Sequence, residues 1–82
     1  MQIHETIARA FVREFDVPCT WQDFHGFARR SGLSGMAAAK KMRSLLVRVE
    51  RLQAVQKANP PTSDAWQQAS ALLVPLFSAL AQ

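Results

Sequence analysis

Residues 27–43, FARRSGLSGMAAAKKMR, contain the corner on which the arrangement of the predicted helices depends. Ser31 and Gly32 are expected to end one helix, because glycine readily takes the left-handed conformation that closes a helix C-terminus. Ser34 is then placed to cap a new helix with its hydroxyl group. The stretch therefore predicts two helices joined by a turn of three or four residues.

Two helices are predicted on the N-terminal side of this corner. In the first, over 2–15, apolar residues recur at steps of three and four, as in an amphipathic helix: Ile3, Ile7, Ala10, Phe11 and Phe15. Asp16-Val17-Pro18 is expected to end this helix, because the residue before a proline is pushed out of the helical region. Thr20 then opens the second helix, in a Thr-Trp-Gln-Asp sequence that is a capping box with Asp in the place of Glu.

The third predicted helix, over about 34–58, is the longest and is divided into two faces. Its apolar stripe consists of Met42, Leu45, Leu46, Val49 and Leu52. The opposite side of the same helix is basic and consists of Lys40, Lys41, Arg43, Arg48 and Arg51. Only Val47 lies among these charges, so the pattern predicts one buried face and one exposed basic face.

The sequence Asn59-Pro60-Pro61-Thr62 is expected to end the third helix. Thr62 or Ser63 then caps a fourth helix within 63–81. This helix is apolar nearly all round, which is typical of a buried or interface element. Pro75 removes one helical hydrogen bond and is expected to kink the helix or to end it at Val74. With no strand pattern, the sequence predicts a single all-α domain, 1–82. Its expected architecture is a compact bundle of about four helices with a long basic third helix and an apolar C-terminal helix.

Over about residues 24–43 the chain resembles the helix-turn-helix DNA-binding proteins. Ala28 matches the small residue where the two helices of that motif cross, and Gly32 matches the turn glycine four positions later. Phe27 and Leu33 match the apolar residues beside them. The resemblance implies that the third helix reads DNA, with Ala38 packed inward and the following residues on the DNA side: Ser34, Gly35, Met36, Ala39, Lys40 and Arg43.

The chain departs from the helix-turn-helix pattern in three ways. Ser31 and Lys41 stand where the family usually has apolar residues. Gly35, Met36 and Ala39 offer almost no hydrogen bonding to base edges. The third helix is also about twice as long as a usual recognition helix.

The distribution of charge along the chain indicates a polyanionic partner. Segment 40–57 holds six basic residues against one acid, a net +5, which exceeds the +4 of the whole chain. Cations on one helical face pair with phosphates and give salt-dependent, weakly specific binding. The sequence therefore predicts a small nucleic-acid-binding regulator of phage or plasmid type that contacts DNA through helix 34–58. The predicted contact residues are Arg29, Arg30, Ser34, Lys40, Lys41, Arg43, Arg48 and Arg51.

A second interpretation is a protein-binding inhibitor or adaptor, such as an anti-defence protein, that turns the same basic face toward an acidic surface of a larger host complex. Aromatic residues and arginine commonly anchor such interfaces. A third is that the basic stripe is only a solvated face. Because the fourth helix exposes apolar groups on many sides, a homodimer is also predicted, with an interface formed by Trp66, Leu73, Leu76, Phe77 and Leu80.

Several other classes of function find no support in the sequence. No Gly-rich phosphate loop, paired catalytic carboxylates or metal-ligand spacing is present, so we expect no enzyme, cofactor, metal or small-molecule substrate. The most apolar segment, 69–81, is too short to cross a bilayer, and no secretion signal is evident. Cys19 is the single cysteine, which suits a reducing compartment. The expected location is the cytoplasm.

Overall fold

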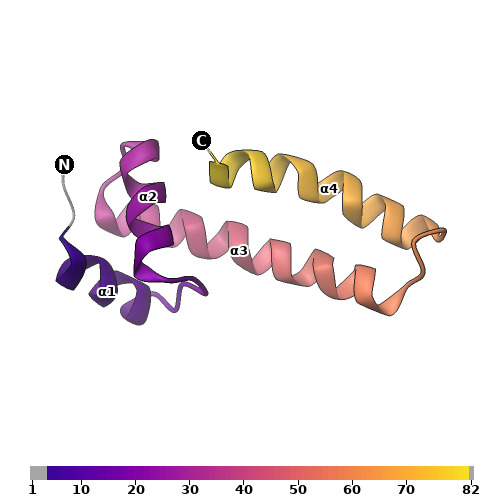
Figure 1. Ribbon diagram of the computed structural model, residues 1–82, viewed down its shortest axis with the longest axis horizontal. Helices are drawn as coiled ribbons and strands as arrows, with labels where there is room; N and C mark the ends of the chain where they lie inside the picture. The colour runs from indigo at the N-terminus through magenta and orange to yellow at the C-terminus, as the bar shows by residue number, and fades with distance from the viewer. Residues whose placement is uncertain (1–3, 82) are drawn as a thin grey trace.

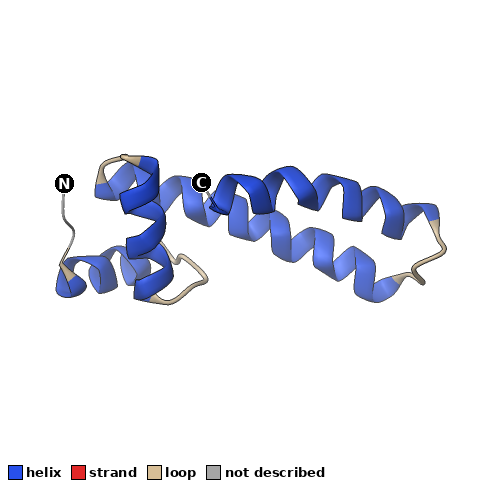
Figure 2. Cartoon of the chain, turned by 45° about the horizontal axis from the view of Figure 1, so that its top comes forward, coloured by secondary structure: helices blue, strands red, loops and turns tan. Residues whose placement is uncertain are grey.

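The computed structural model describes residues 4–81, and this part of the chain forms four helices and no strand, which confirms the predicted all-α fold (Figure 2). The helices are α1 (Glu5–Glu14), α2 (Trp21–Ser31), α3 (Gly35–Ala58) and α4 (Asp64–Ala81). The predicted start of the first helix, including Ile3, lies outside the described residues. The other boundaries fall within about two residues of those predicted.

The long helix α3 is the spine of the molecule (Figure 1). Helices α1 and α2 lie together at its N-terminal end, and α4 runs back antiparallel along the rest of it, so that the end of α4 returns toward α2. The molecule is elongated, with extents of 44 × 21 × 16 Å. One side of α3 is therefore covered along its length by the other three helices.

Capping hydrogen bonds and one left-handed glycine determine where the helices begin and end. The Thr20 hydroxyl accepts a hydrogen bond from the Asp23 amide (3.2 Å), and the Ser34 hydroxyl accepts one from the Ala37 amide (3.3 Å). Gly32, at the end of α2, has a φ of 67°, which confirms the left-handed cap. At the start of α4 it is Ser63 that accepts a hydrogen bond, from the Trp66 amide (3.2 Å). The corner between α2 and α3 therefore follows from its own residues.

The core between α1, α2 and α3 combines two aromatic rings with small residues. Phe24 and Phe27 are fully buried, and the Phe24 ring stacks on Phe11 with 5.9 Å between centroids. On α3 they meet Ala38 and Ala39, neither of which is exposed. Small side chains let the helices approach closely, which brings α1 and α2 onto the first turns of α3.

A second core joins α3 to α4. Val49 packs with Leu73 and Leu76, and Leu45, Leu52 and Leu80 lie against them. Pro75 was expected either to kink the fourth helix or to end it at Val74. The second alternative is wrong, because α4 continues to Ala81. Leucines on both sides of the proline are held against α3, and this packing offsets the one hydrogen bond that Pro75 cannot donate.

Candidate nucleic-acid interface

The basic face of α3, by which we mean Lys40, Lys41, Arg43, Arg48 and Arg51, is exposed at every one of its five positions. On the other side of the helix Ala38, Met42 and Val49 are buried against α1, α2 and α4. Lys40 and Arg51, the first and last of the five cations, are eleven steps apart along the chain, which corresponds to about 16 Å along the helix axis. The fold thus presents these cations on one helix, as the sequence predicts.

These cations are not neutralised by acidic neighbours. Within residues 4–81 the ion pair is between Arg9 and Glu5 on α1 (2.8 Å), far from the basic face in the sequence. The single acid of α3, Glu50, makes no ion pair with a described residue. The positive potential of the face is therefore available to an external anion.

Arg30 belongs to the predicted contact set but already has a partner in the chain. Its Nη2 atom donates a hydrogen bond to the carbonyl oxygen of Leu80 (2.8 Å), near the last turn of α4. Lys41 lines a hollow of about 270 Å³ together with Arg30 and Ala79. Two cations therefore flank the C-terminal end of α4, where the helix dipole favours positive charge. Arg29 is exposed beside them.

The placement of the helix-turn-helix-like residues is mixed. Phe27, Ala28 and Ala38 are buried, as the resemblance implies. Two of the residues expected on the DNA side, Gly35 and Ala39, are wrongly predicted, since both are buried. The cause is the α1 and α2 packing described above, with the Phe11 ring seated directly against Gly35.

Of the remaining residues expected on the DNA side, Lys40 and Arg43 are exposed with the basic face. Met36 is 53% exposed. Ser34 is also exposed, but its hydroxyl group caps α3. The side of α3 that faces solvent therefore carries mainly Lys and Arg side chains, which contact phosphates and can also donate hydrogen bonds to base edges.

At the far end of the basic face, an apolar side chain lies beside the arginines. Arg48, Arg51 and Leu52 of α3 line a surface hollow of about 250 Å³ with Leu72 of α4. Leu72 is 55% exposed. Guanidinium groups next to an exposed apolar side chain can contact a protein as well as a phosphate.

The five residues predicted for an oligomer interface do not share one surface. Leu73 and Leu76 are each 5% exposed and fill the chain's own α3–α4 core. Trp66 and Leu80 are half-buried, and Phe77 is exposed. Val74, which was not among the residues predicted for the interface, is 66% exposed. Because apolar residues surround α4, no periodic pattern in the sequence separates the buried positions of this helix from the exposed ones.

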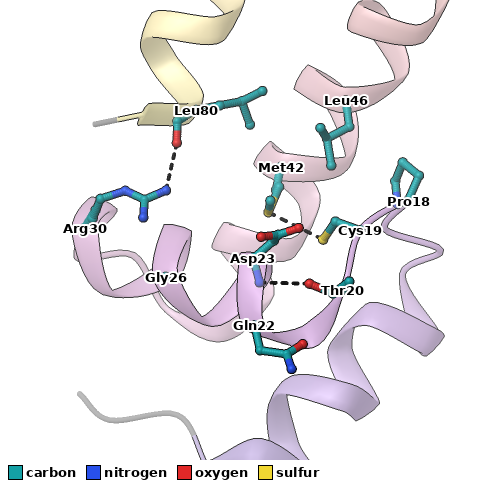
Figure 3. A pocket seen from close by; sticks show the side chains of 10 residues that line it. All are labelled: Pro18, Cys19, Thr20, Gln22, Asp23, Gly26, Arg30, Met42, Leu46 and Leu80. Carbon is teal, nitrogen blue, oxygen red and sulfur yellow. Dashed lines mark hydrogen bonds between the residues drawn. The ribbon is translucent and has the colours of Figure 1, made fainter.

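A hollow of about 530 Å³ lies between α2 and the loop before it, the first half of α3 and the end of α4 (Figure 3). The thiol of Cys19 faces it and contacts the sulfur of Met42 at 3.9 Å. Burial, with a smaller contribution from the Asp23 carboxylate, raises the pKa of the Cys19 thiol to about 11. The thiol is therefore protonated at neutral pH and is a poor nucleophile.

In the part of the chain that the structure describes, no three His, Cys, Asp or Glu side chains gather as metal ligands would. None of the four helices combines the length and the apolar character needed to cross a membrane. Comparisons of the chain with protein-family models, with curated proteins and with solved structures find no match.

Proposed function

We propose that this protein binds nucleic acid, with DNA as the favoured ligand, through the basic face of α3. The observation that carries the proposal is the exposure of five cations on one helix, none of which is in an ion pair with residues 4–81. Duplex DNA offers a regular array of phosphates, and each phosphate that a Lys or Arg neutralises releases condensed counterions.

The expected binding is directed at the phosphate backbone and tolerant of base sequence. Among the positions between the cations, Ser44 has only a hydroxyl group, Val47 has no hydrogen-bonding group in its side chain, and the Glu50 carboxylate would be repelled by the phosphates. Lys and Arg side chains that contact phosphates position a duplex without selecting one base sequence. Affinity should therefore differ little between unrelated duplexes of equal length.

The test compares two double variants of equal net charge by fluorescence anisotropy on a labelled duplex of random sequence. Lys40→Gln/Arg43→Gln removes two cations from the basic face, and Arg13→Gln/Lys57→Gln removes two exposed cations elsewhere. The first should make the negative slope of log affinity against log salt shallower by about 0.9 per lost phosphate contact, whereas the second should leave the slope nearly unchanged. Equal effects of both variants would mean that only net charge matters and would contradict a defined face.

A protein-binding role is the second candidate, favoured by the surface where Leu72 adjoins Arg48 and Arg51. An inhibitor or adaptor of a larger assembly would use such a mixed apolar and cationic surface against an acidic partner. Truncating Leu72 would then weaken binding strongly, because apolar anchors dominate protein interfaces. Binding to DNA should be nearly insensitive to Leu72→Ala, so this variant separates the two roles.

A further inference from the structure

The side of α4 that does not pack on α3 combines exposed apolar side chains with small or uncharged polar ones. Val74 is 66% exposed and Phe77, one turn later, is 47% exposed. Asp64, in the first turn, is the one charged residue of the helix. We call this surface the outer face of α4; with its immediate neighbours at steps of three and four it consists of Gln67, Ser70, Ala71, Val74, Phe77, Ser78 and Ala81.

The charge distribution narrows the kind of partner that this face can accept. An acidic surface would be attracted to α3, and against α4 it would lose its hydration without meeting a countercharge. A surface that covers Val74 and Phe77 should therefore be uncharged as well. The outer face of a second copy meets this requirement, because pairing two such faces desolvates no charged side chain beyond Asp64.

Repulsion between like charges also favours pairing through the outer face of α4. The five exposed cations of α3 would face each other if two copies paired through α3. Pairing through the outer faces instead leaves both α4 helices between the two basic faces, which keeps the like charges apart. Because the same patch then serves both copies, the arrangement closes as a symmetric dimer.

We propose that the outer face of α4 binds the same face of a second copy, with Val74 and Phe77 of each copy as the apolar anchors. The dimer would carry two basic faces of α3 on its outer sides. If the proposed nucleic-acid binding holds, and this step rests on it, each dimer can hold two separate duplexes and bridge them.

The dimer is tested by multi-angle light scattering on the full chain. The wild type should shift from the monomer mass of 9.2 kDa toward twice that value between about 10 and 500 µM, since a modest apolar interface gives weak association. Val74→Glu should remain at 9.2 kDa while keeping the helical circular dichroism of the wild type. Thr6→Glu adds the same charge at an exposed position of α1 and should dimerise normally. A monomeric wild type, or a Val74→Glu variant that dimerises like it, overturns the proposal.

Bridging is tested with one duplex fixed to beads and a second, labelled duplex in solution. Wild-type protein should retain the labelled duplex, and Val74→Glu should bind the fixed duplex but retain at most about a tenth as much of the labelled one. Equal retention by both proteins would overturn the bridging arrangement. Failure of the wild type to bind the fixed duplex would instead refute nucleic-acid binding, and the scattering result would still decide the dimer.

Discussion

Replacing Gly35 with alanine should destabilise this protein, although alanine is the better helix former. A Cβ atom built at Gly35 contacts the Cε2 atom of Phe11 and lies 2.6 Å from its Cζ atom. The ring cannot move freely, because it stacks on Phe15 and on the fully buried Phe24, with 5.9 Å between centroids in each pair. The added methyl group must therefore displace α1 from α3 or force Phe11 from its position.

The loss of stability expected for Gly35→Ala is the difference between two opposing effects. Forcing an extra carbon into a well-packed core costs about 1–3 kcal/mol. Alanine in place of glycine within a helix returns at most about 1 kcal/mol, and less in the first turn, where Gly35 lies. The net loss should be roughly 1–2 kcal/mol, and each kcal/mol lowers the melting temperature of a chain of this size by about 4–8 °C.

Urea denaturation followed by tryptophan fluorescence measures this loss, with Gly26→Ala as the matched control. A Cβ atom at Gly26 meets only the side chain of Arg30, with Nη1 at 3.0 Å; this side chain is exposed and can shift, at the cost of at most its one hydrogen bond to the Leu80 carbonyl. Gly26→Ala should therefore leave the stability unchanged or raise it by up to about 1 kcal/mol. A Gly35→Ala protein as stable as the wild type would refute the seating of α1 on the first turn of α3.

Three further perturbations test single features of the structure. Arg30→Met removes the donor to the Leu80 carbonyl, so hydrogen exchange at residues 79–81 should accelerate while exchange in the middle of α3 does not. The raised pKa of Cys19 predicts that stability falls as the pH rises from about 9 to about 11, because the unfolded thiol ionises first, and that Cys19→Ala lacks this fall in urea titrations. Gly32→Val should lower the free energy of unfolding by about 1–2 kcal/mol, since valine resists the left-handed conformation, and an unchanged melting temperature would contradict this.

The sequence predicted the helix boundaries well because the signals for them are local. Thr20, Gly32 and Ser34 each act within three or four residues along the chain, so their roles do not depend on tertiary packing. Pro75 shows the limit of such reasoning. A proline by itself tends to break a helix, but the leucines on both sides of Pro75 pack against α3. The sequence around position 75 gives no sign of this contact.

The exposure of the candidate site's residues could be predicted where a helix is long and regular, and not where packing between distant elements decides it. The helical period alone places the cations of α3 on the side opposite its apolar stripe, so the exposure of these cations could be predicted. The burial of Gly35 depends on Phe11, more than twenty residues earlier, and no pattern within α3 indicates it. In α4, where apolar residues surround the helix, periodicity could not distinguish the buried Leu73 from the exposed Val74.

The binding of wild-type protein to a duplex of random sequence, measured at a series of salt concentrations, tests the proposed role of α3 most directly. If about three to five of the exposed cations contact phosphates, the slope of log affinity against log salt should lie between about −2.7 and −4.5. Two unrelated duplexes of equal length should give the same slope and similar affinities. The absence of binding even at about 50 mM salt would contradict a nucleic-acid-binding function for the basic face.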